Sequence, residues 1–166
     1  MVRTISFKLL YGLVILRHAR RRLVTIAVTA NPTDQWIAGQ VTDAFPWDET
    51  PRHLIRDRDS AFGPAYLRRI RAMRIRDHPT PPRSPWEYGH VVRLIGSILR
   101  ESLDHLIVFD EAQLRRLLKK YASYYNQIRK HLSLMKDSPD FRRRQKLGAI
   151  AAIPILGVLH HQYVRG

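Results

Sequence analysis

The alternation of apolar and polar positions predicts a β-hairpin at the start of the chain. Apolar residues recur at every second position over about residues 4–17, from Ile5 to Leu13. Residues 22–30 form a second run that is β-branched and nearly continuous, which is typical of a central strand. A basic turn separates the two runs, so they are expected to pair as antiparallel strands.

The spacing of apolar residues then changes to a helical period. Thr33 is a candidate N-cap for a first helix that Pro46 ends, and Asp110 and Glu111 stand where a later helix begins. Four prolines between residues 79 and 85 exclude a helix there and predict an extended loop. The remaining predicted elements are a strand at 53–56, a helix at about 63–73, a short strand near Ile75, helices at about 86–103 and 110–126, and a terminal hairpin or strand within 147–165.

The order of these elements predicts an α/β fold, a mixed sheet flanked by helices. At 166 residues the chain fits one main domain, which we place at residues 1–135. Residues 136–166 form a basic C-terminal extension with an apolar tail. The apolar segment 8–16 is too short to span a bilayer, so we interpret it as a buried strand and expect no membrane partner.

The charge of the chain indicates a polyanionic partner. Lys and Arg total 29 against 14 Asp and Glu, for a net charge of +15. DNA is the first candidate, because each neutralised phosphate releases a condensed counterion; an anionic membrane surface, or separate solvated faces, would also accommodate the charge. The chain has no cysteine, which excludes disulfides and thiolate metal sites and fits a reducing cytoplasm.

Three motifs in sequence order carry a family resemblance. Asp57 ends an apolar run and is followed five residues later by Phe62. The second motif is Pro85-Trp86-Glu87-Tyr88-Gly89-His90-Val91-Val92-Arg93, and the third is Tyr125-Asn126-Gln127-Ile128-Arg129-Lys130-His131-Leu132-Ser133-Leu134. Together they resemble the integrase core of bacterial insertion-sequence transposases and retroviral-type integrases.

The resemblance implies a ribonuclease-H-like fold and a metal-dependent polynucleotidyl transferase. It implies DNA integration and transposition as the process, element ends and target DNA as partners, and a bacterial cytoplasm as the location. In the family, Mg²⁺ or Mn²⁺ is held by three carboxylates; two hard cations held this way activate the attacking oxygen and stabilise the leaving one.

The departures from the family pattern affect those carboxylates. Val92 stands at the glutamate position and Tyr88 at the preceding asparagine position, and no Asp or Glu precedes Asp34. Met1 therefore resembles an internal start that has removed the first strand with its acid. Asp57 remains as the residual catalytic and metal-binding acid, with a turn residue as the alternative; we expect it to bind Mg²⁺ weakly or not at all.

Neighbouring acids are poor substitutes for the missing glutamate. Glu87 lies five residues before Val92, which is about 140° around a helix, and Glu101 lies nine residues beyond. Asp59 points away from Asp57 if the strand continues. We therefore predict a catalytically impaired remnant that binds DNA.

Two alternatives stay open. One is a DNA-binding or interaction module that regulates intact transposase copies, with a homo-oligomer or the intact transposase as partner. The other is an active enzyme whose missing strand comes from an upstream reading frame. The candidate DNA-contacting residues are Arg83, Trp86, Tyr88, His90, Arg93, Arg100, Arg129, Lys130 and His131. For His131, local packing or capping is the alternative to DNA contact.

Overall fold

The predicted hairpin at the start of the chain is present in the computed structural model, which describes residues 1–46, 48–81, 89–141, 147–156 and 159–165. Strand β2 (Leu9–Leu16) pairs antiparallel with β3 (Leu23–Thr29), with a register shift between Ile15 and Leu16. The short strand β1 (Val2–Arg3) adds to β2 at Leu9 and Leu10 only.

The hairpin begins later than the alternation predicted. Ile5 and Phe7 were expected in the strand, but both are exposed and lie in the turn between β1 and β2. The backbone of Thr4 bonds with that of Lys8, and the Thr4 hydroxyl accepts a hydrogen bond from the Lys8 amide. This closes a tight turn in which Phe7 adopts a φ of 58°. The side chain that fits the strand pattern is thus left in solvent.

The next four elements follow the prediction closely. Helix α1 (Asp34–Ala44) begins where the Thr33 hydroxyl accepts a hydrogen bond from the Trp36 amide at 3.2 Å. Strand β4 (His53–Arg56) leads to Asp57, and helix α2 (Pro64–Ala72) follows. Strand β5 (Arg76–Pro79) pairs parallel with β4.

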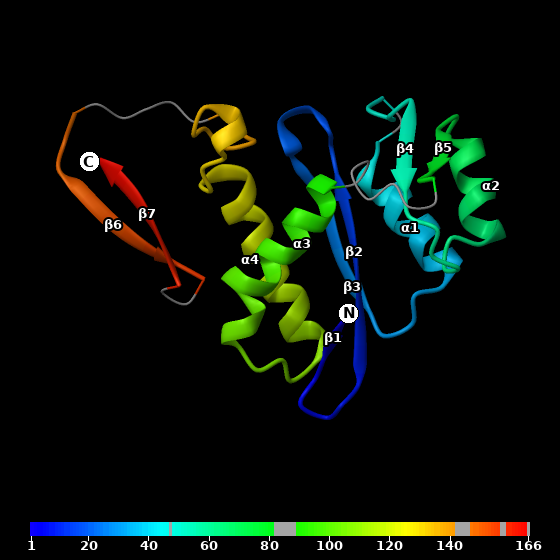
Figure 1. Cartoon of the computed structure of the whole chain (residues 1–166), viewed down its shortest axis with the longest axis horizontal. Coiled ribbons are helices and arrows are strands. Elements are labelled where there is room, and N and C mark those ends of the chain that lie inside the picture. Colours follow the sequence, from blue (N-terminus) through cyan, green and yellow to red (C-terminus); the bar gives the residue numbers. More distant parts are fainter. Residues whose placement is uncertain (47, 82–88, 142–146, 157–158, 166) are drawn as a thin grey trace.

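The second half of the described chain is mainly helical. Helix α3 (Gly89–Glu101) and helix α4 (Glu111–Gln127) lie against the hairpin, and Asp110 caps α4 by accepting a hydrogen bond from the Gln113 amide. The predicted terminal hairpin is present as β6 (Ile150–Ile155) and β7 (His160–Arg165) (Figure 1). Short 3₁₀ turns lie at Ala19–Arg21, Leu103–His105 and Leu132–Leu134.

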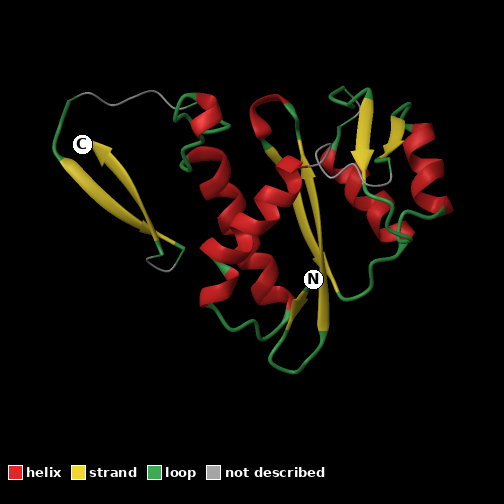
Figure 2. Cartoon of the chain, in the orientation of Figure 1, coloured by secondary structure: helices red, strands yellow, loops and turns green. Residues whose placement is uncertain are grey.

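The hairpin β2–β3 separates two apolar clusters. Leu10, Val14 and Leu16 point to the cluster formed with α3 and α4, whereas Leu13 and Ile15 point to the cluster formed with α1, α2 and β4. This is the two-sided burial expected of a central strand. Helices therefore cover both faces of the hairpin, as Figure 2 shows.

The structure is mixed α/β, but the strands do not join into the one mixed sheet that we predicted. Among the described residues they form three sheets, with the orders β1-β2-β3, β4-β5 and β6-β7. Strands β2 and β4 are not hydrogen-bonded to each other. Helix α1 lies between the two sheets in the packing, because it contacts β3 of the first sheet and also contacts α2, which packs on β5 of the second. No helix in the described part of the chain is long and apolar enough to cross a membrane.

Candidate functional site

Asp57 lies at the C-terminal end of β4, as the sequence predicted, and is exposed. One of its carboxylate oxygens accepts a hydrogen bond from the Asp59 amide at 3.3 Å, and Asp59 in turn accepts one from the Ala61 amide at 2.8 Å. These contacts make two successive turns in which an aspartate binds the amide two residues further on. The geometry of Asp57 thus matches the turn alternative raised from the sequence, while its carboxylate stays open to solvent.

Beneath Asp57, an ion pair fixes the end of β4. The Arg56 guanidinium donates to both carboxylate oxygens of Asp77 on β5, at 2.9–3.3 Å, and the Tyr66 hydroxyl donates to the same carboxylate at 3.2 Å. Arg56 also lies 4.9 Å from the centre of the Phe62 ring. The aromatic residue five positions after Asp57 therefore supports the strand end, and burial together with Asp77 raises the pKa of Tyr66.

Val92, at the glutamate position of the motif, lies in the first turns of α3 and is 51% exposed. The acids considered as substitutes are engaged elsewhere or lie outside the described residues. Glu101, at the end of α3, accepts hydrogen bonds from Arg129 at 2.6 and 3.1 Å and from the Tyr121 hydroxyl at 3.0 Å. Asp59 is used in its own turn, and Glu87 falls in the stretch that the structure leaves out.

A two-metal centre needs several carboxylates around the same point. The described residues contain no group of three or more His, Asp or Glu side chains that could hold a metal ion. The donors present, two exposed aspartates that each already accept a hydrogen bond from a backbone amide, do not fit the pair of cations that integrase chemistry uses. We therefore derive no catalytic step through a metal from this geometry.

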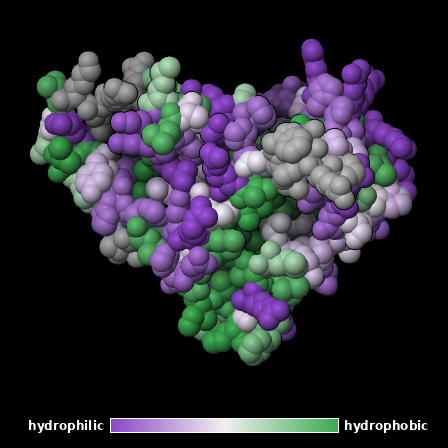
Figure 3. All heavy atoms as spheres, viewed as in Figure 1, coloured by the Kyte–Doolittle hydropathy of each residue, from purple (hydrophilic) through white to green (hydrophobic). Residues whose placement is uncertain are grey.

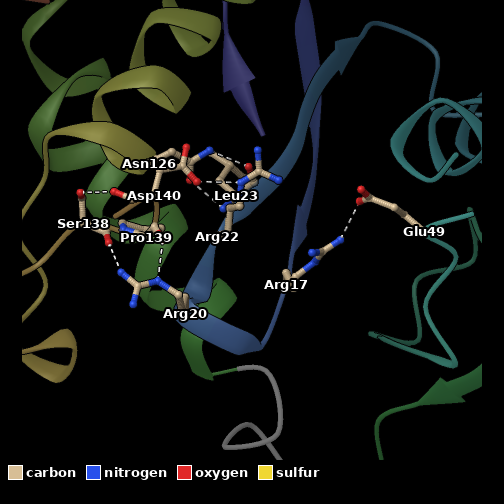
Figure 4. Close-up of polar contacts among 9 residues, drawn as sticks. All are labelled: Arg17, Arg20, Arg22, Leu23, Glu49, Asn126, Ser138, Pro139 and Asp140. Carbon is tan, nitrogen blue, oxygen red and sulfur yellow. Dashed lines mark hydrogen bonds and ion pairs between the residues drawn. The ribbon is translucent and has the colours of Figure 1, made fainter. Parts of the chain in front are cut away.

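The Tyr125–Leu134 motif connects α4 to the hairpin β2–β3. Asn126, 9% exposed, accepts from the Leu23 amide at 2.9 Å and donates to the Leu23 carbonyl at 2.8 Å (Figure 4). The backbone carbonyl of Asn126 accepts a hydrogen bond from the backbone amide of Asp140. One side chain thus satisfies both backbone groups of a buried strand residue, which explains why an asparagine is needed there.

Arg129 belongs to a half-buried polar network between α3 and the end of α4. Besides Glu101, its guanidinium donates to the Ser97 hydroxyl at 3.2 Å. The hydrogen bonds to Glu101 raise the pKa of Arg129; burial alone would raise the pKa of Glu101, but Arg129 and Tyr121 lower it. The charge of Arg129 is therefore compensated inside the protein and directed away from solvent.

His131 is buried, with its ring edge-on to Tyr125 at a centroid distance of 4.7 Å. Burial, followed by the charge of Arg129, lowers its pKa, and its Nε2 atom has no hydrogen-bond partner among the described residues. The geometry matches the packing alternative. Lys130, between these two residues, is exposed.

The other candidate DNA-contacting residues divide into two groups. Arg93 and Arg100 are exposed on α3, and His90 stands at its start, 5.6 Å from the His18 ring. Burial, followed by Arg21, lowers the pKa of His90. The residues Arg83, Trp86 and Tyr88 lie outside the described part of the chain.

Two arginines of the hairpin turn have a structural role that the sequence did not indicate. Arg20 donates to the Ser138 and Pro139 carbonyls at 2.8 Å and to the Asp137 carboxylate at 2.7 Å, and Arg22 donates to Asp140 at 2.9 Å. Figure 4 shows them reaching from the turn to the segment after α4. The only available signal was the pair of acids in that segment, more than a hundred residues away in sequence.

The second half of the described chain is similar to a known family. Residues 73–139 match the family model described as the integrase core domain. The chain is similar to this family over that stretch, which is less than half of its length. The matched stretch contains Val92 and the whole Tyr125–Leu134 motif, whereas Asp57 lies before it. None of the curated proteins compared with the chain matches it. Integrase cores bind DNA, use divalent metal ions and act in DNA integration, and the resemblance inferred from the motifs is confirmed at this level.

Proposed function

We propose that this chain is a remnant of the integrase core of an insertion-sequence transposase that binds DNA in the bacterial cytoplasm and has lost strand-transfer activity. The observation that carries the proposal is the combination of an exposed Val92 with the engagement of Asp59 and Glu101, the described acids that were considered as replacements for the glutamate. The net charge of +15 supports retained DNA binding.

Within this proposal, DNA contacts the exposed side of α3. Arg93 and Arg100 are exposed there, and no ion pair in the described structure involves them. Lys130 is exposed after α4. Arg129 and His131 contribute indirectly, because their side chains hold the end of α4 in place.

Two strands have a free edge in the described part of the chain: β2 has no partner over residues 11–16 on the side away from β3, and β4 pairs only with β5. Such edges are available for pairing with a further strand. A strand that paired there would not restore the glutamate, because Val92 stands at its position.

The test is Mn²⁺-dependent nicking and strand transfer on duplexes that carry element ends, with binding to the same duplexes measured without metal. The proposal expects binding that weakens as salt rises and no cleavage by the wild-type chain. The control is Asp57→Asn, which should bind like wild type. Cleavage that disappears in Asp57→Asn would refute the loss of activity, and absence of binding would refute the DNA-binding function.

An exposed apolar surface favours a second candidate, an interaction module that regulates intact transposase copies. Ile5, Leu106, Ile107 and Phe109 are between 42% and 62% exposed. The first three line one hollow together with Val2 and Arg3 of the N-terminal strand. Figure 3 shows a hydrophobic area at the bottom of the face in view. Exposed apolar patches of this kind mark protein interaction sites. Sedimentation velocity of the wild-type chain and of Ile107→Ser tests it; association that Ile107→Ser abolishes supports the module, and a monomer at all concentrations contradicts it.

A further inference from the structure

The outer face of α2 and the two residues that lead into β5 carry a dense positive charge. The segment from Pro64 to Arg76 contains five arginines and no acid. All five are exposed, and none takes part in an ion pair in the described part of the chain. We call Arg68, Arg69, Arg71, Arg74 and Arg76 the α2 arginine surface. It lies at the outer edge of the molecule in Figure 1, in a region coloured as hydrophilic in Figure 3.

Helical geometry places these charges together on one side. Tyr66 and Ile70 are buried in the cluster with α1. With 3.6 residues per turn, residue 68 falls opposite this apolar face, and residues 69 and 71 fall on either side of residue 68, about 100° and 60° from it. The arginines therefore occupy the exposed part of the helix surface. Planar guanidinium groups of this kind bind phosphate oxygens in a bidentate manner.

The nearest acids do not neutralise this face. The Asp77 carboxylate is bound by Arg56 and Tyr66 on the inner side of β5. The Asp34 carboxylate accepts a hydrogen bond from the Ala65 amide at 2.8 Å, at the other end of α2. Since both carboxylates are occupied, the positive charge of the surface is left for a partner outside the chain.

Arg74 gives an independent indication of function. It is the residue after the helix cap and has a φ of 57°, a conformation that favours glycine. The Arg74 amide donates to the Arg71 carbonyl and the Ile75 amide donates to the Ile70 carbonyl, which together make the helix ending that usually contains glycine. An arginine at this position strains the backbone, and its side chain makes no hydrogen bond or ion pair in the described structure that would offset the strain. Phe7 and Met135 have similar φ values, so the strain supports a functional role at Arg74 because the residue held there is a charged member of the arginine surface.

From these observations we infer that the α2 arginine surface binds the phosphate backbone of duplex DNA. The inference rests on the proposed DNA-binding function and adds a surface to it. Helix α2 is about 13 Å long, so the five guanidinium groups extend over several successive phosphates of a duplex. The contacts are to the backbone, so this surface supplies affinity and orientation and no base sequence preference.

A matched pair of charge variants tests the inference by fluorescence anisotropy with a labelled 20-base-pair duplex, roughly two helical turns. One variant carries Arg68→Gln, Arg69→Gln and Arg71→Gln. The control carries Arg116→Gln, Lys119→Gln and Lys120→Gln, which removes the same charge from an exposed side of α4. A plot of log affinity against log salt has a negative slope, and each lost phosphate contact makes it less steep by about 0.9. The slope of the α2 variant should therefore be less steep than that of wild type by about 2–3, and the slope of the control should change much less.

A second pair of variants separates DNA binding from folding. Arg74→Gly relieves the backbone strain, so the thermal midpoint should rise while DNA affinity falls. Met135→Gly relieves the same strain at an exposed, uncharged position with a φ of 54°, so its thermal midpoint should rise with DNA affinity unchanged.

The outcomes distinguish this inference from the proposed function. If the wild-type chain does not bind the duplex, both are refuted. If the wild-type chain binds but the α2 variant and the α4 control lose affinity equally, binding depends only on total charge and the inference is refuted. An Arg74→Gly variant that binds like wild type refutes it as well.

Discussion

Replacing Asn126 by alanine tests whether the Tyr-Asn motif serves the fold or the chemistry. The Asn126 side chain makes two hydrogen bonds to the backbone of Leu23, at 2.9 and 2.8 Å, in a site where both residues are buried. In Asn126→Ala, the amide and carbonyl of Leu23 lose these partners inside the protein.

The expected loss follows from those two bonds. Each hydrogen bond contributes about 1 kcal/mol net, and a buried group left without a partner costs about 1–3 kcal/mol. Alanine recovers roughly 0.5 kcal/mol of helix propensity relative to asparagine. We therefore expect the free energy of unfolding to fall by about 2–4 kcal/mol.

The assay is urea unfolding followed by circular dichroism at neutral pH, compared with Gln127→Ala. Gln127 is the next residue of the same helix, is exposed, and makes no side-chain hydrogen bond in the described structure. Gln127→Ala should lie within about 0.5 kcal/mol of wild type. If Asn126→Ala and Gln127→Ala have the same stability, the two bonds to Leu23 do not hold α4 to the hairpin and our interpretation of the motif is wrong.

Three further predictions follow from other contacts. Gly63→Ala should destabilise the chain by about 1–2 kcal/mol in urea unfolding, because a Cβ atom there would lie 2.8 Å from the Asp34 carboxylate that caps α2. The pKa of Glu101 is lowered in the folded state, so its ion pair stabilises the fold fully above pH 4.5 and loses this effect as the pH falls below that value. The thermal midpoint of wild type should therefore decrease below pH 4.5, and the midpoint of Glu101→Gln should decrease less. Burial lowers the pKa of His131 in the folded state, so stability should fall as the pH drops below 6.5, and His131→Phe should reduce this dependence, with the contribution of His90 remaining.

The sequence predicted the elements well where the signal is local. The cap at Thr33, the strand before Asp57 and the start of the helix at Asp110 and Glu111 depend on neighbouring residues, and each is present within a residue or two of its predicted position. The prediction that Ile5 and Phe7 lie in a strand was wrong, and the cause is local too. A turn that needs a positive φ leaves no mark on an alternating apolar pattern when its residue is not glycine.

Contacts between distant segments were not predictable in this way. Arg20 meets Asp137 across more than a hundred residues, and the sequence shows only a basic turn and an acidic loop. For Arg129, the sequence could not decide between DNA and Glu101, because either partner accepts the hydrogen bonds of a guanidinium. The division of the strands into separate sheets was not predictable from the sequence either, because it depends on whether β2 and β4 pair with a common strand.

The residues that identify the family and the residues that would perform its reaction are therefore physically separate in this chain. Asn126, Arg129 and His131 are buried or half-buried, and each acts on the protein itself, so their substitution would damage the fold in any integrase core of this shape. Val92 is exposed and has no structural duty that requires a carboxylate, so a glutamate there can be lost at little cost to folding. The proposed loss of strand transfer therefore predicts that the first set is kept for the fold while the glutamate position is free to change.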